Sequence, residues 1–266
     1  MDPKMDIESI QRTGIAAAYK SGKLLRSYMG EHFAIRKKGL KDLVTDADTQ
    51  SEKIILDTIR KKFPNHAILA EESGTKHGNE KYQWIIDPLD GTINFAHQLP
   101  FFAISIAFAH EGRTEMGIVF NPLSGELFSA ISGRGATLNN DKIQVSTTRI
   151  IGDCLLATGF PYNVLETFES VTRRFSNCLR SAQGIRRLGS AALDLCYVAC
   201  GRLDGFWEQN LNAWDTAAGA LIALEAGAVI TDFSNKPFAM TDKEILATNG
   251  KIHQEMISLL DKKEPI

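Results

Sequence analysis

The sequence predicts an α/β protein, with an α+β arrangement in its first half and strand-helix alternation in its second half. Two observations predict this class. Before about residue 145, two amphipathic helical patterns precede strand patterns separated by turns. After that point, short apolar strands alternate with helices. Because the 266 residues are 44% hydrophobic, the chain can bury a large core in one compact unit or two closely packed subdomains.

The elements of the first half follow from hydrophobic periodicity. Residues 5–29 and 48–62 carry apolar side chains at helical spacing. Short apolar strands at 67–70 and 84–86 each run into an acidic residue. Turn residues separate three further strands, which predicts an antiparallel sheet. These three strands span about 103–109, 115–120 and 126–132.

The second half alternates between the two element types. Its expected strands are 155–158, 204–207 and 229–232, and its expected helices are about 164–180, 190–201, the segment opened by Asp215, and 251–261. The sequence holds no linker or repeat, so the boundary near residue 145 is expected to be a packed interface rather than a hinge.

The most informative stretch joins the 84–86 strand to Asp87, Pro88, Leu89, Asp90, Gly91 and Thr92. Two acids on a proline-stiffened turn repel each other by about 4 kcal/mol at about 4 Å and an effective dielectric near 20. A cation such as Mg²⁺ relieves that repulsion, since it binds carboxylate and carbonyl oxygens together with substrate phosphate. Gly91 allows close approach of an anion. The alternative is an ordinary turn, in which these residue types are common.

Further acidic positions support the site. Glu71 follows the 67–70 strand, and Asp215 opens a helix, where it could also act as an N-cap. Asp48 precedes a helical pattern, so a helix-start acid is the alternative for this residue.

Taken together, these segments resemble the inositol monophosphatase family of Mg²⁺-dependent, Li⁺-sensitive phosphatases, in its bacterial SuhB-type branch. The matching segments are residues 42–48, 71–73, 87–92, 189–192, Glu208 and 214–215, within a resemblance that spans about residues 5 to 260. The resemblance implies a layered α-β-α-β-α sandwich, with an antiparallel sheet in the N-terminal half and a mixed sheet in the C-terminal half. The site would lie between the halves.

The resemblance also implies a ligand set for two to three Mg²⁺ ions and inhibition by Li⁺. Glu71, Asp87 and the Leu89 carbonyl would hold a first ion, and Asp87, Asp90 and Asp215 a second. Residues 1–145 would then form an α+β subdomain carrying most metal ligands. Residues 146–266 would form an α/β subdomain carrying Asp215 and the substrate contacts.

By the same resemblance, Asp48, Thr92 and Glu71 are catalytic, and Thr92 relays the proton of the nucleophilic water toward Asp48. The implied substrate-binding residues are Leu89, Asp90, Gly91, Thr92, Arg186, Gly189, Ser190, Ala191, Glu208 and Asp215. For Arg186, a solvated surface pair with Arg187 is the alternative.

The expected reaction is hydrolysis of myo-inositol 1-phosphate and similar polyol phosphates by a metal-activated water. Fructose 1,6-bisphosphate and 3'-phosphoadenosine 5'-phosphate are the alternative substrates within the superfamily. Phosphatases that form an aspartyl phosphate typically carry one residue between their two aspartates. Two residues separate Asp87 from Asp90, which favours metal ligation.

A different class of function is a regulatory partner of RNA polymerase in transcription antitermination, which the SuhB-type resemblance implies. A local basic bias fits such a partner, although solvated helix faces are the simpler interpretation. The residues of this basic bias are Arg173, Arg174, Arg180, Arg186 and Arg187.

The resemblance further implies a homodimer. The formal net charge of −2 gives no general nucleic-acid signal, and no apolar segment approaches 20 residues, so we expect a cytoplasmic protein without a membrane partner.

Overall fold

The computed structural model describes residues 5–30, 35–37, 43–161 and 163–263. Asp42, the first residue of the 42–48 motif, lies outside the described residues. No helix in the described part of the chain has the length and hydrophobicity needed to span a bilayer.

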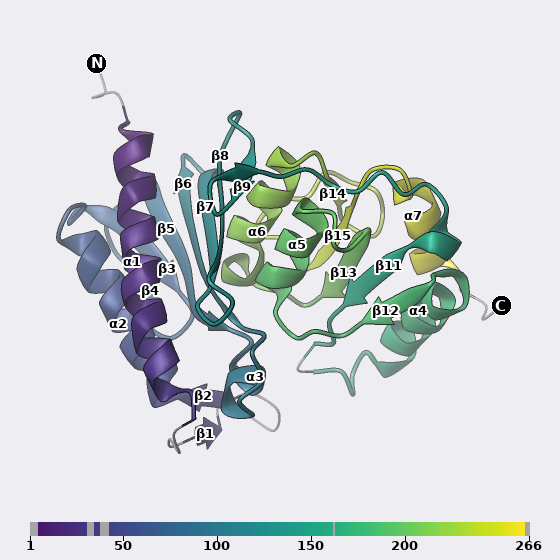
Figure 1. Ribbon diagram of the computed structural model, residues 1–266, viewed down its shortest axis with the longest axis horizontal. Coiled ribbons are helices and arrows are strands. Elements are labelled where there is room, and N and C mark those ends of the chain that lie inside the picture. The colour runs from purple at the N-terminus through teal and green to yellow at the C-terminus, as the bar shows by residue number, and fades with distance from the viewer. Residues whose placement is uncertain (1–4, 31–34, 38–42, 162, 264–266) are drawn as a thin grey trace.

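The first half is built on a large sheet whose outer face is covered by helices α1 (Ile7–Tyr28) and α2 (Asp46–Arg60) (Figure 1). Among the described residues, this sheet has eight strands in the order β10-β9-β8-β7-β6-β5-β3-β4. All neighbours pair antiparallel except β3 and β5. The strands are β3 (His66–Ala70), β4 (Gly74–Lys76), β5 (Asn79–Asp90), β6 (Ala103–His110), β7 (Arg113–Asn121), β8 (Glu126–Ile131), β9 (Ala136–Leu138) and β10 (Asp141–Lys142). A separate hairpin joins β1 (Ile35–Lys37) to β2 (Leu43–Thr45).

The second half contains a smaller mixed sheet. In the described residues its order is β12-β11-β13-β15-β14, with β11 parallel to both neighbours and β15 antiparallel to both of its own. The strands are β11 (Leu155–Thr158), β12 (Gly184–Arg186), β13 (Gly205–Gln209), β14 (Val229–Thr231) and β15 (Glu244–Thr248). A short 3-10 turn, η1 (Ile151–Asp153), precedes β11.

Helices fill the remaining layers. Helices α5 (Ala191–Ala199) and α6 (Ala213–Glu225) lie between the two sheets, and α4 (Phe168–Ser181) and α7 (His253–Asp261) cover the far side of the smaller sheet (Figure 1). The short helix α3 (Thr92–Ala96) follows β5. The five layers therefore run α-β-α-β-α, and the expected fold class is confirmed. The sheet of the first half is mixed rather than wholly antiparallel as expected, because β3 and β5 pair in parallel.

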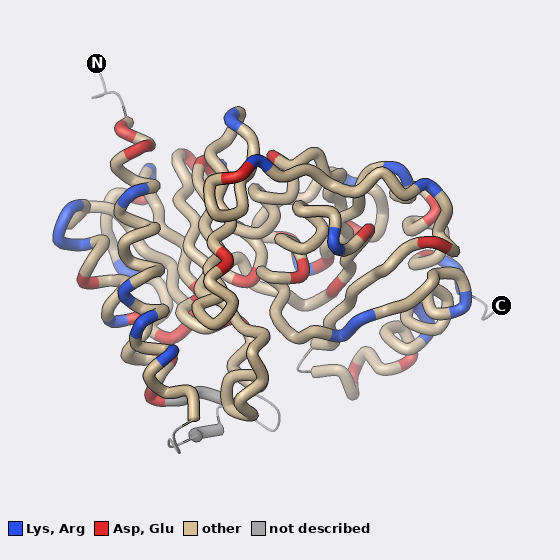
Figure 2. The backbone as a smooth tube through the Cα atoms, viewed as in Figure 1, with Lys and Arg blue, Asp and Glu red and all other residues tan. Residues whose placement is uncertain are grey.

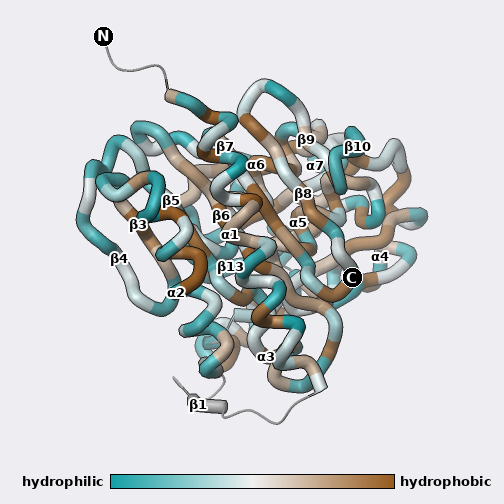
Figure 3. Tube along the Cα trace, turned by 60° about the vertical axis from the view of Figure 1, so that its left-hand side comes forward, coloured by the Kyte–Doolittle hydropathy of each residue, from teal (hydrophilic) through white to brown (hydrophobic). Residues whose placement is uncertain are grey.

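In the described residues, the hydrophobic core forms three clusters between the layers. Phe108 and Ile55 belong to the cluster beneath α1 and α2, whereas Ile85, Leu195 and Phe206 belong to the central cluster, which draws residues from both halves. Figure 3 shows hydrophobic residues concentrated along β5, β6 and β8. Because the central cluster spans both sheets, the two halves share apolar burial at their interface. The subdomain boundary near residue 145 stays a prediction.

Several elements differ from expectation. Helix α4 begins at Phe168 rather than near residue 164, because residues 163–166 form turns. The strands β1, β2, β4, β9, β10, β12 and β15 were not predicted from the sequence, yet β15 lies between β13 and β14 in the smaller sheet. A run of three apolar residues, as in β15, gives too little periodicity to separate a strand from other structures.

Candidate active site

The carboxylates of Asp87 and Asp90 are brought to one face of the large sheet by a β-bulge. Asp87 pairs with Ser105 of β6, and Asp90 pairs with Ala103, so three steps along β5 oppose two along β6. Ser105 and Ala103 share a face because they are two residues apart. The extra residue in β5 therefore turns both acids to that same face, and Pro88 is tolerated there because a bulge interrupts the ladder of hydrogen bonds.

Gly91 and Thr92 complete the turn after the bulge. Gly91 has φ of +93°, and a Cβ at this position would lie 3.0 Å from the Phe101 carbonyl oxygen and 3.1 Å from that of Gly189. Only glycine fits this left-handed, crowded position without strain. The turn thus packs directly on the Gly189 loop of the second half.

The Thr92 hydroxyl connects two other site residues. It lies 3.0 Å from Oδ1 of Asp48 and 3.1 Å from the Leu89 carbonyl oxygen. A hydroxyl has one proton, so it donates to one of these acceptors at a time, and the ionised carboxylate forms the stronger bond. Asp48 is fully buried in the first turn of α2. The position of Asp48 therefore allows both roles, that of an acid at the start of α2 and that of a partner of Thr92 in a proton relay.

Most of the expected site residues line one cavity of about 280 Å³ between the two halves. Its walls include Glu71, Asp87, Leu89, Asp90, Gly91, Thr92, Gly189, Ala191, Glu208 and Asp215. Two expected residues stand behind the wall. Asp48 accepts from Thr92, and the Ser190 hydroxyl donates to Oδ2 of Asp90 over 2.6 Å.

Burial raises the pKa values of the carboxyl groups in the site. Burial, reinforced by the charges of Glu71, Asp90 and Asp215, raises the pKa of Asp87 well above its usual range, against a hydrogen bond from the Leu89 amide. Burial raises the pKa of Asp90 to about 6, opposed by its bonds to Ser190 and to the Ala192 amide. Both shifts arise mainly from removal of the carboxyl groups from water, and for Asp87 neighbouring negative charges add to it.

Asp215 and Glu208 show the same effect from the second half. Burial raises the pKa of Asp215 to about 8, although its Oδ2 accepts a 2.6 Å hydrogen bond from the Asn212 amide. Asp215 is therefore the third helical residue of α6 and not its N-cap. Burial also raises the pKa of Glu208 to about 8 against the charge of Arg187. A Cβ on Gly159 would lie 2.0 Å from the Glu208 carboxyl carbon, so this glycine leaves the space that the carboxyl group occupies.

The structure places Arg187, rather than the expected Arg186, on the cavity wall. The Arg187 guanidinium lies 5.9 Å from the Phe160 ring centroid, and its charge opposes the raised pKa of Glu208. Arg186 is exposed and donates to the carbonyl of Ile185. Figure 2 shows the other basic positions spread over α1, α2 and the α4 end of the molecule.

Two functional candidates were missed by the sequence analysis. The Asn94 amide donates to the carbonyls of Phe101 and Leu188, at 2.7 and 2.8 Å, and so ties α3 to the Gly189 loop. Asp194 of α5 is fully buried, its Oδ1 has no hydrogen-bond partner, and burial together with the charges of Glu208 and Asp90 raises its pKa well above the usual range. Neither belongs to a recognisable local motif, because their contacts come from distant segments.

The donor set fits a hard divalent cation. Glu71, Asp87, Asp90 and Asp215 supply carboxylate oxygens, and Leu89 supplies a carbonyl, all on the walls of one cavity. Within the described ranges, no three acidic, histidine or cysteine side chains already stand as a preassembled ligand group. A bound cation would offset the charges of Glu71, Asp90 and Asp215, which add to the effect of burial in raising the pKa of Asp87.

Comparison with known proteins identifies the family of this chain. The model of the inositol monophosphatase family matches residues 6–264. The chain is 45% identical over 257 residues to an inositol-1-monophosphatase of Synechocystis sp., which covers 96% of this chain and 90% of the relative. It is 42% identical over 247 residues to the Nus factor SuhB of Escherichia coli strain K12, covering 92% of each chain.

A solved structure gives the same result. The extragenic suppressor protein SuhB of Bartonella henselae is 40% identical and superposes with a TM-score of 0.93, covering 96% of this chain and 100% of that chain. The resemblance drawn from the sequence motifs is confirmed at the level of sequence and fold. The chain belongs to the inositol monophosphatase family.

Proposed function

We propose that this protein is a Mg²⁺-dependent phosphatase that hydrolyses myo-inositol 1-phosphate and similar polyol phosphates. Family membership supports a phosphatase, and the name of the Synechocystis relative supports inositol 1-phosphate as substrate. The observation that carries the proposal is the gathering of Glu71, Asp87, Asp90 and Asp215 around one cavity. Four carboxyl groups from three segments match the chemistry of a site that binds cations and a phosphate ester.

The proposed metal ligands divide between the two halves. Glu71, Asp87 and the Leu89 carbonyl would hold one Mg²⁺, and Asp87, Asp90 and Asp215 a second. When bound, the ions would neutralise phosphate charge and lower the pKa of a coordinated water. We further propose that a third, weaker ion binds at Glu71 and that Li⁺ inhibits the enzyme.

The chain's own residues would handle the proton and the substrate. The Thr92 hydroxyl would donate a hydrogen bond to Asp48, and its oxygen would accept one from the nucleophilic water. As the water attacks, its proton would pass to the Thr92 oxygen while the Thr92 proton passes to Asp48. Glu208, Asp90 and Asp215 would accept hydrogen bonds from ring hydroxyls. Backbone amides from Gly189 to Ala191 would donate to the ester, and Arg187 would add positive charge to the wall opposite the acids.

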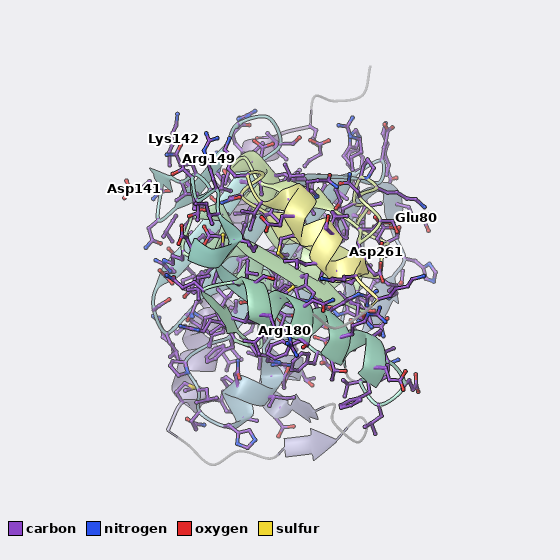
Figure 4. All side chains as sticks on the ribbon, turned by 90° about the vertical axis from the view of Figure 1, so that its right-hand side faces the viewer. Glu80, Asp141, Lys142, Arg149, Arg180 and Asp261 are labelled. Atoms are coloured by element: carbon purple, nitrogen blue, oxygen red, sulfur yellow. The ribbon has the colours of Figure 1, made fainter. Side chains whose placement is uncertain are left out.

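The test is phosphate release from myo-inositol 1-phosphate, with and without Mg²⁺, alongside fructose 1,6-bisphosphate and 3'-phosphoadenosine 5'-phosphate. Asp90→Asn should lower kcat/KM by more than about 100-fold, as expected when an electrostatic contact to the transition state is lost. The matched control is Asp141→Asn, because this acid lies exposed on β10 at the edge of the molecule (Figure 4). If the enzyme prefers another of these substrates, the proposed substrate is wrong but the mechanism stands. Turnover that does not depend on Mg²⁺ would contradict the mechanism.

A second role, as a Nus factor that contacts RNA polymerase, is supported by the name of the Escherichia coli relative. Two of the five arginines that suggested it have other contacts, since Arg174 stacks 4.7 Å from the Phe233 ring and Arg187 faces the cavity. Arg180 lies on the outward face of α4 (Figure 4). Capture of RNA polymerase by the Asp90→Asn variant would separate this role from catalysis, and light scattering would test the proposed homodimer.

A further inference from the structure

We infer that helix α2 is the positioning element of the active site, and that its buried residues Ser51 and Glu52 hold the two backbone segments carrying Glu71, Asp87 and Asp90. The inference rests on the proposed metal-dependent function. Ser51 and Glu52 lie outside the cavity wall and would act through those acids rather than on substrate.

Glu52 fixes the turn that carries Glu71. Its side chain is 4% exposed, and its Oε2 accepts hydrogen bonds from the amides of Glu72, at 2.9 Å, and Ser73, at 3.3 Å. The Glu72 amide belongs to the same planar peptide unit as the Cα of Glu71, so holding that amide orients Glu71. The amide of Glu71 itself donates to the Ile86 carbonyl of β5. Glu71 is therefore held from the strand on one side and from α2 on the other.

Ser51 fixes the bulge between Asp87 and Asp90. Its hydroxyl is fully buried and lies 2.7 Å from the Pro88 carbonyl oxygen, which accepts its proton. Ser51 also lies 2.6 Å from the hydroxyl of Ser21 in α1, so Ser21 donates when Ser51 bonds to Pro88. A bulge interrupts the ladder of backbone hydrogen bonds, and α2 satisfies this backbone group in the buried interior.

One face of α2 thus contacts three segments of the site. Asp48, Ser51 and Glu52 follow the i, i+3, i+4 spacing that places side chains on the same helix face. Asp48 accepts from Thr92, while the other two hold the bulge and the Glu71 turn. Farther along the same helix, Ile55 is fully buried in the core beneath the large sheet. A rigid helix anchored in the core can therefore set the relative positions of acids that repel one another.

The chain offers a matched control for Glu52. Glu225 at the end of α6 also accepts hydrogen bonds from two backbone amides of a turn, those of Gly133 at 2.8 Å and Gly135 at 2.7 Å. That turn joins β8 to β9 and carries none of the proposed site residues. Glu225→Ala therefore removes the same kind of contact without touching the cavity.

The experiment measures Mn²⁺ binding to the purified full chain by electron paramagnetic resonance, together with the Mg²⁺ dependence of phosphate release and the urea midpoint of unfolding. We expect Glu52→Ala to weaken Mn²⁺ affinity by at least about 10-fold, the equivalent of one ordinary hydrogen-bond contribution. Glu225→Ala should stay within about 2-fold of wild type while lowering the urea midpoint comparably. Glu52→Gln should restore most of the affinity, because its amide oxygen can accept from both backbone amides.

If Glu52→Ala does not fold, Glu52→Asp and Glu52→Gln decide the question. The shorter aspartate keeps the charge but cannot reach both amides, so it should weaken Mn²⁺ affinity whereas glutamine should not. Equal affinities in all Glu52 variants, or a Gln variant as impaired as the Ala or Asp variant, would overturn the inference. If the Glu52 variants give those results while the wild type binds Mn²⁺ and releases phosphate, only the inference about α2 fails and the proposed function stands. A wild type that does neither would overturn both.

Discussion

The Thr92 hydroxyl lies 3.0 Å from a carboxylate oxygen of Asp48, in a buried contact that joins α3 to α2. Thr92→Val removes the hydroxyl and nearly preserves the shape, so kcat should fall by about 100-fold or more, the range of general-base contributions. Thr92→Ser keeps the hydroxyl and should retain most activity. Steady-state kinetics of phosphate release distinguish the two variants. A Val variant with near wild-type kcat would show that the relay to Asp48 is not used.

The closeness of Gly159 to Glu208 leads to a specificity prediction. In Gly159→Ala, the new Cβ would fall 2.0 Å from the Glu208 carboxyl carbon and would displace this group. KM for myo-inositol 1-phosphate should rise by up to about 10-fold, the value of a lost hydrogen bond. A substrate without ring hydroxyls, such as p-nitrophenyl phosphate, should keep its KM. Gly152→Ala is the control, because its nearest neighbour would be 3.9 Å away; equal effects on both substrates would contradict the prediction.

The acidic residues of the site could be predicted from the sequence, but the geometry that brings them to one face could not. Asp87 and Asp90 could be recognised because a buried strand runs into them. Their common face could not, since a spacing of three in a regular strand places side chains on opposite faces. The bulge that corrects this depends on pairing with β6. Local pattern therefore predicted which residues matter, whereas tertiary pairing decided where they point.

The same limit explains the cavity arginine. Arg186 and Arg187 are adjacent and chemically identical, so residue type alone gives no basis for choosing between them. Strand β12 ends at Arg186 and Gly189 turns the chain with φ of +92°, and only the structure shows that Arg187 lies on the cavity wall. Asn94 was missed for a related reason, because its partner carbonyls lie in two other segments.

The placement of Arg187 gives a pair of variants with different expected effects. Arg187→Met should raise KM for myo-inositol 1-phosphate by about 10-fold, since a hydrogen bond to a charged group contributes about 1.5–3 kcal/mol. Arg186→Met should change KM by less than about 2-fold, as is usual for an exposed side chain. Removing the Arg187 charge also removes what opposes the raised pKa of Glu208, so the pH dependence of kcat/KM should move to higher pH. The opposite ranking of the two variants would return the role to Arg186.

Asp194 has the clearest consequence for stability. Its pKa is raised well above the ordinary 3.8 by burial and by the charges of Glu208 and Asp90, so the folded state holds this proton to higher pH than the unfolded state does. Stability must then fall as pH rises above about 4 through the titration of this group. Asp194→Asn removes this ionisation penalty and should therefore stabilise the protein at pH 7.5 relative to wild type. Urea unfolding at pH 7.5 should show the gain, and the gain should vanish on acidification below about 4, where both states hold the proton.

The exposed Asp141→Asn control should stay within about 0.5 kcal/mol of wild type at both pH values. A variant at Asp194 that is less stable than wild type at both would mean that this carboxyl group has a compensating partner.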